Sequence, residues 1–184
     1  MPGTVSIGDT APNFDLSSTE DAVLMLKDEV VRTAVVVYFF ADLGSDRVRR
    51  DLDALNRGLD ALAKLNARVL AVSPAKLDEL KKLQAERKLL FPLLHDDRNF
   101  SASYGVVPGA PEKPADPALA VVGRRQDVKW LANPVASAED ALPQVEKLLK
   151  DLPSPTRSYP KSVINRSVEF LMRFRRPNPQ AAGR

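Results

Sequence analysis

The hydrophobic positions fall into short unbroken apolar runs separated by segments with helical spacing. Residues 34–40, 68–72 and 118–122 are rich in β-branched side chains and carry almost no charge. Runs of this length and composition predict strands that are buried on both faces at the centre of a sheet. Residues 127–130 follow the third run closely enough to pair with it as a hairpin.

Helices are predicted between and after these strands. Ser45 is a suitable N-cap for a helix whose apolar residues recur at intervals of three and four positions. Ser73 and Pro74 predict the start of a second helix, and residues 136–149 predict a third. We therefore expect an α/β fold, a three-layer sandwich around a central mixed β-sheet. The apolar face of the first helix consists of Val48, Leu52, Leu55, Leu59 and Leu62.

Composition removes several kinds of chemistry. The chain has no cysteine and one histidine, which excludes disulfides, thiolate metal sites and thiol-based mechanisms. His95 stands beside Asp96 and Asp97, but one imidazole and two adjacent carboxylates do not converge easily on a metal ion. We interpret this segment as a surface turn, and we expect no metal and no cofactor.

Charge divides the chain unevenly. The net charge is +3, yet residues 155–184 hold seven basic side chains and one acidic one. We expect a domain over residues 1–150, a Pro-rich linker over 151–161, a basic amphipathic helix over 162–176 and a flexible tail over 177–184. Only this C-terminal region is a candidate for anionic partners.

The helix predicted from Ser162 to Arg176 has three possible roles. Its apolar side can dock onto the body or a partner subunit, which we favour, or bind a protein groove or membrane surface. Nucleic acid is disfavoured because aromatic residues are not interleaved as a stacking platform. No apolar run approaches the length of a membrane span, and the N-terminus lacks the pattern of a signal peptide. We expect a cytoplasmic protein.

Several segments resemble a known family. Residues 7–16 (IGDTAPNFDL), 69–73 (VLAVS) and 91–97 (FPLLHDD), with 103–106 (SYGV), resemble the peroxiredoxins, the alkyl hydroperoxide reductase and thiol-specific antioxidant group. The resemblance covers about residues 5–150. It implies a thioredoxin-like fold of the peroxiredoxin type and a homodimer.

Three of the four catalytic positions of that family are lost, and the fourth is kept only as a conservative change. The family carries Pro-x-x-x-Thr-x-x-Cys after the central strand, and this chain has Ala41, Ser45 and Val48 at those places. The family's second active-site arginine should fall near residues 116–118, where no arginine stands. An engineered cysteine removal would explain Val48 but not the other changes, so we favour a natural degenerate homologue. The resemblance leaves open whether the bond before Pro117 is cis.

Basic residues crowd the start of the helix that follows Ser45. Arg47, Arg49 and Arg50, together with Ser45, could form an anion site where the family binds peroxide. We favour a plain solvated surface in which nearby acids balance the arginines. Ser45 lacks a nearby base, so it is better interpreted as an N-cap than as a nucleophile. The balancing acids are Asp46, Asp51 and Asp53.

These observations predict a peroxiredoxin-like protein that is not a peroxidase and acts through binding or oligomerisation. One alternative is an enzyme that reuses the old pocket for an anionic substrate. The other is a regulatory subunit of a true peroxiredoxin.

Overall fold

The computed structural model describes residues 5–97, 100–106 and 116–152, and Met1–Leu152 forms one compact unit. The predicted helix over 162–176, the tail over 177–184 and the linker beyond Leu152 lie outside the described residues. Among those described, no helix is long and apolar enough to cross a membrane. The strands are β1 (Asp15–Ser18), β2 (Val23–Met25), β3 (Ala34–Phe39), β4 (Ala67–Ser73), β5 (Leu93–His95), β6 (Ala118–Val122) and β7 (Val128–Ala132). The helices are α1 (Leu26–Val30), α2 (Asp46–Lys64), α3 (Leu77–Arg87), the 3₁₀ helix η1 (Phe100–Tyr104) and α4 (Ala138–Asp151).

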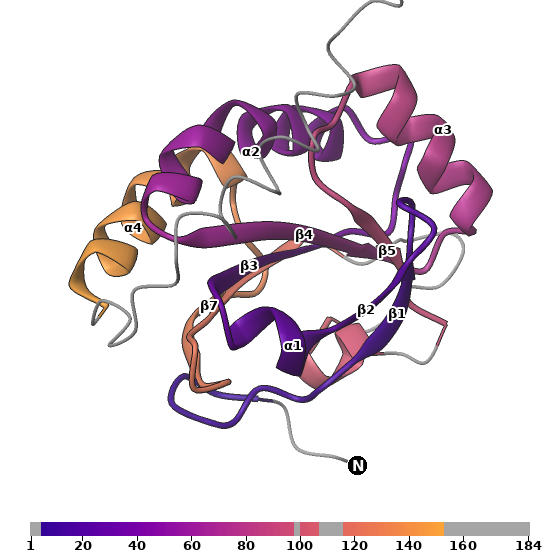
Figure 1. Cartoon of the computed structure of the whole chain (residues 1–184). Helices are drawn as coiled ribbons and strands as arrows, with labels where there is room; N and C mark the ends of the chain where they lie inside the picture. Colours follow the sequence, from indigo (N-terminus) through magenta and orange to yellow (C-terminus); the bar gives the residue numbers. More distant parts are fainter. Residues whose placement is uncertain (1–4, 98–99, 107–115, 153–184) are drawn as a thin grey trace, which may run out of the picture. The chain divides into compact units, whose positions relative to one another are not determined.

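The seven described strands form one mixed sheet in the order β2-β1-β5-β4-β3-β6-β7 (Figure 1). Strands β3, β4 and β5 are parallel neighbours, and β6 joins β3 antiparallel before turning back as β7. All six residues of β3 are buried. The three apolar runs of the sequence therefore form the inner strands, as predicted.

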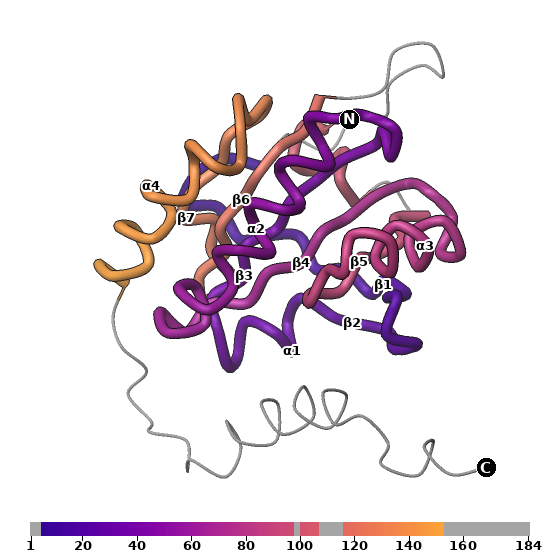
Figure 2. Tube along the Cα trace, turned by 90° about the horizontal axis from the view of Figure 1, so that it is seen from above, coloured from indigo at the N-terminus to yellow at the C-terminus, as the bar shows by residue number. Residues whose placement is uncertain are grey.

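Both faces of the sheet are covered, which confirms the three-layer sandwich. Helices α2, α3 and α4 pack over one face, where Val36 and Tyr38 of β3 point. Helix α1, η1 and the N-terminal segment pack over the other face against Val35 and Val37. Figures 1 and 2 show α2 and α4 side by side on their face of the sheet. Adjacent residues of β3 thus enter opposite cores, as the two-residue period of a strand requires.

Helix α2 begins as the sequence predicts, but α3 does not. Ser45 is the N-cap of α2, whereas α3 starts at Leu77 with Lys76 as its N-cap. The backbone of Ser73 is instead used by the sheet, where its carbonyl accepts a hydrogen bond from Asp96 N–H at 2.8 Å. Its hydroxyl accepts from Ala75 N–H and closes a turn ahead of the helix.

Two further details concern the entry to β5 and the proline bonds. The carbonyl of Pro92 accepts the Ala71 N–H at 3.2 Å, immediately before β5 begins at Leu93. In the described part of the chain the cis peptide bond precedes Pro134, and the bond before Pro117 is trans.

The N-terminal segment closes part of the outer edge of β7. Thr10 forms an isolated antiparallel bridge with Asp127. Gly8 N–H donates to the carbonyl of Val128 at 2.8 Å, and Val128 N–H donates to the carbonyl of Asp9 at 2.9 Å. The N-terminal segment therefore satisfies both the N–H and the carbonyl of Val128, the first residue of β7.

Candidate functional site

The first turn of α2, where the resemblance places the family's chemistry, is built from local polar contacts. The Asp42 carboxylate accepts the Gly44 N–H at 2.8 Å, and its carbonyl accepts the Ser45 N–H at 3.4 Å. The Ser45 hydroxyl accepts the Val48 N–H at 3.5 Å. Ser45 therefore acts as the N-cap that the sequence predicts.

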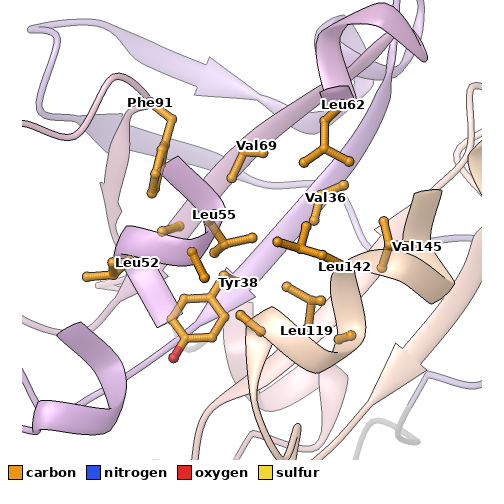
Figure 3. Packing of buried hydrophobic residues seen from close by; sticks show 14 of the residues in the cluster. Val36, Tyr38, Leu52, Leu55, Leu62, Val69, Phe91, Leu119, Leu142 and Val145 are labelled. Atoms are coloured by element: carbon orange, nitrogen blue, oxygen red, sulfur yellow. The ribbon is translucent and has the colours of Figure 1, made fainter. Parts of the chain in front are cut away.

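Val48 is the third residue of α2, within the turn that the sequence predicts, and its side chain faces the core. It is 2% exposed and belongs to the cluster that contains Tyr38, Leu52 and Leu55. Figure 3 shows Tyr38 beside these leucines with its hydroxyl oxygen at the edge of the apolar packing. This position is consequently apolar and closed to solvent.

The three arginines near Ser45 take separate directions. Arg47 donates to the carbonyl of Val135, and its Nη1 lies 3.7 Å from Asp116 Oδ1. Arg49 donates from Nε to the carbonyl of Leu43 at 3.3 Å. The exposed side chain of Arg50 forms no hydrogen bond or ion pair with the described residues.

A cavity of about 240 Å³ lies between the first turns of α2 and α4. It brings Arg47 and Arg50 to one wall and leaves out Arg49 and Ser45, so the structure separates the four residues of the sequence-predicted anion site. The cavity is lined by Arg47, Arg50, Asp51, Ala136, Ser137 and Glu139.

The acids expected to balance these arginines serve other partners. Asp51 is buried and accepts hydrogen bonds from the Tyr38 hydroxyl and the Ala138 N–H, each at 2.8 Å. Asp53 pairs with Arg87. The interpretation of a simple solvated, mutually balanced surface is wrong for both residues.

Asp51 thus links β3, α2 and α4, a role that sequence reasoning missed. It stands three residues after Val48, at the border of the apolar stripe of α2. An acid on an inward-facing helix position was the available signal, because a buried carboxylate needs hydrogen-bond donors.

Burial and, second, the charge and hydrogen bond of Asp51 raise the pKa of Tyr38 well above its usual value. Burial also raises the pKa of Tyr104, whose hydroxyl is buried without a partner in the described part of the chain. Both groups must remain neutral in the folded protein.

We therefore expect the free energy of unfolding to fall at alkaline pH. Because the pKa is raised in the folded state, each tyrosine stabilises the fold fully below a pH of about 10, where tyrosine in the unfolded chain begins to ionise. Above that pH only the unfolded state loses the proton, so each tyrosine lowers the free energy of unfolding by about 1.4 kcal/mol per pH unit. Urea unfolding at pH 9, 10 and 11 measures this slope. Tyr38→Phe should be less stable at pH 9 but show a shallower alkaline decline; an unchanged slope would contradict the assignment.

The segment around His95 is not the surface turn that we expected. His95 is half-buried at the end of β5, and its Nδ1 donates to the carbonyl of Ala75 at 2.8 Å. Asp96 is 5% exposed and accepts from the Phe100 N–H at 2.7 Å and the Ser101 N–H at 2.8 Å. Asp96 therefore caps the start of η1, which is a structural role. Within residues 5–97, 100–106 and 116–152, no three potential ligands gather as a metal group.

Residues 7–131 match the sequence profile of the AhpC/TSA family. The chain belongs to the AhpC/TSA family. No curated protein matches it closely enough in sequence to add a more specific relative.

Solved peroxiredoxins share the fold of this AhpC/TSA chain at low sequence identity. Peroxidoxin BcpB from Mycobacterium tuberculosis has a TM-score of 0.73 and 19% identity, over 80% of this chain and 98% of that one. A cysteine-to-serine variant of PrxQ from Xylella fastidiosa has a TM-score of 0.71 and 20% identity, over 79% and 98%. AhpC from M. tuberculosis has a TM-score of 0.66 and 20% identity, over 80% of this chain and 93% of that one. The resemblance to peroxiredoxins and the predicted thioredoxin-like fold are confirmed.

Within this AhpC/TSA chain, residues 116–118, near which the second arginine is expected, include an acidic side chain. Asp116 Oδ1 lies 3.7 Å from Arg47 Nη1. A carboxylate at this place opposes a neighbouring thiolate or peroxide anion, where an arginine would stabilise both. The departure from the family pattern therefore extends to the electrostatics around Val48.

Proposed function

We propose that this AhpC/TSA member is not a peroxidase and acts through binding. The observation that supports the proposal is the burial of Val48 within the core cluster. Apolar packing closes the Val48 side chain off from solvent, so this position supports the fold and offers no reactive group.

The surroundings of Val48 also lack what a reactive thiol needs. A low thiol pKa requires a cation or a free helix N-terminus close to an accessible sulfur. Arg47 is held by Val135 and Asp116, and the Val48 N–H is taken by Ser45. A cysteine placed here would stay protonated and enclosed.

We expect the protein to consume hydrogen peroxide and alkyl hydroperoxides no faster than free thiol does, with thioredoxin or dithiothreitol as reductant. Val48→Cys should add little, and its thiol should react slowly with a disulfide reagent in the folded state. Stopped-flow peroxide consumption is the measurement, with a cysteine-containing peroxiredoxin as positive control. Saturable peroxide turnover by the wild-type chain would contradict the proposal.

Val48→Cys combined with Asp116→Arg separates the two causes of inactivity. If charge alone suppressed the thiol, the double variant would consume peroxide quickly. Because burial also suppresses it, we expect the double variant to remain slow. Rapid turnover by Val48→Cys alone would show that the pocket is still built for catalysis.

Binding can take two forms in this proposal. The first is self-association, since the family resemblance implies a homodimer; light scattering after size exclusion measures the mass. The second is recruitment of a protein partner or a membrane surface by the predicted helix from Ser162 to Arg176. Cytoplasmic location remains a prediction from the sequence.

An enzyme that reuses the pocket for an anionic substrate is less well supported. The buried carboxylate of the cavity, Asp51, already accepts from Tyr38 and Ala138, so it is poorly placed to act as a base. A regulatory subunit of a true peroxiredoxin remains the second binding role, and co-purification with such an enzyme tests it.

A further inference from the structure

We propose that the cavity between the first turns of α2 and α4 binds the carboxylate or phosphate group of a small molecule, through the guanidinium groups of Arg50 and Arg47. The inference rests on the proposed binding function and gives it a ligand class. It keeps Arg47 and Arg50 of the sequence-predicted anion site, leaves out Ser45 and Arg49, and places the site beside the start of α4.

The two arginines offer complementary donors. Arg50 is exposed at the cavity and has no hydrogen-bond or ion-pair partner in the described part of the chain, so its whole fork of N–H groups is available. Arg47 is held in place by the carbonyl of Val135 and lines the same cavity, so its positive charge is fixed there. A fixed guanidinium beside a free one matches the charge and the paired oxygens of an oxyanion.

The first backbone N–H groups of α4 are not available to bind the anion, because they already donate within the protein. The Ala138 N–H donates to Asp51 at 2.8 Å, and the N–H groups of Glu139 and Asp140 donate to the Ser137 hydroxyl at 3.1 and 3.5 Å. Since Ser137 Oγ accepts these bonds, its own hydrogen is left to donate toward the cavity that it lines. The site therefore depends on side chains.

Acidic groups around the cavity are already engaged. Both oxygens of Asp51 accept hydrogen bonds from the protein. The Glu139 carboxylate lies 3.2 Å from Arg57 and is 71% exposed. Asp116 faces Arg47 at 3.7 Å and is 66% exposed. Water screens these last two carboxylates, whereas the side chain of Arg50 has no competing partner among the residues that the structure describes.

The volume sets the size of the ligand. About 240 Å³ lies below the roughly 300–1,000 Å³ of pockets that enclose drug-sized molecules. The cavity consequently fits a compact metabolite with one oxyanion group better than a nucleotide or a long peptide.

The test titrates the full chain at low ionic strength with inorganic phosphate and, separately, acetate, following backbone amide resonances by NMR. We expect saturable shifts at the amides of Ser137 and Ala138, and the tighter of the two probes identifies the oxyanion. Arg50→Gln should weaken binding about tenfold or more, because it removes charge-assisted hydrogen bonds. Glu139→Gln should strengthen it by a factor of about two to three through the loss of a nearby negative charge.

Two matched variants remove the same charge outside the cavity. Arg49→Gln, on the same turn, and Arg125→Gln, in the β6–β7 turn, should leave the affinity within a factor of about two. If either weakened binding as much as Arg50→Gln, the cavity assignment would be overturned. The absence of saturable shifts in the wild-type chain would overturn it too, while leaving the peroxide result and the proposed function intact.

Discussion

Asp51→Ala is expected to lower the free energy of unfolding by about 2–6 kcal/mol. Each buried group that loses its partner costs about 1–3 kcal/mol, and this change leaves both the Tyr38 hydroxyl and the Ala138 N–H unsatisfied. The whole stability of a domain is about 5–15 kcal/mol. The variant should therefore be marginally folded, and urea unfolding followed by circular dichroism measures the loss.

The matched control is Asp53→Ala on the same helix. Asp53 forms a half-exposed ion pair with Arg87, and such pairs contribute about 0–1 kcal/mol. Tyr38→Phe isolates one arm of the link, and the double variant with Asp51→Ala should cost less than the sum of the two single changes. If Asp51→Ala and Asp53→Ala proved equally mild, Asp51 would not hold the three elements together.

Removal of residues 155–184 should lower the melting temperature clearly or dissociate an oligomer. This region lies outside the described residues, and the expectation comes from the apolar side of the predicted helix. Burying Phe170, Leu171 and Phe174 is worth about 1.5–3 kcal/mol each, which is large against the stability of a domain.

Thermal melts and size exclusion of full-length and truncated protein distinguish docking from recruitment. A helix that packs only against a partner or a membrane contributes little to the stability of the isolated protein. Its removal would leave both the melting temperature and the number of subunits unchanged, and that result would overturn the docking role. A truncation that stops after residue 176 is the control, since it keeps the helix and removes only the last eight residues.

The parts of the fold that the sequence predicts are those in which one physical effect dominates. Strand β3 is a run of apolar residues that only a doubly covered strand accommodates, and its six residues are indeed buried. Ser45 caps α2 because a short polar side chain directly before an amphipathic segment can accept a free N–H of the first helical turn. The loss of catalytic chemistry at Val48 can be predicted from the residue type alone, because valine carries no nucleophile.

Other features depend on partners that are distant in the sequence. The start of α3 is set by the use of Ser73 in the sheet, where the Asp96 N–H binds its carbonyl. The β1–β2 hairpin is short, and β2 has three residues, too few for a clear alternation. Asp51 finds one donor 87 positions away in Ala138, and local patterns do not encode such a pairing.

The strap formed by Gly8, Asp9 and Thr10 along β7 also bears on how the protein avoids aggregation. An exposed sheet edge is a template on which further chains can add strands without limit. Here the strap occupies the start of β7, where it satisfies both the N–H and the carbonyl of Val128, and the opposite edge, β2, has three residues. Each edge thus presents only a short row of free backbone groups, so the seven described strands form a sheet with little capacity to grow.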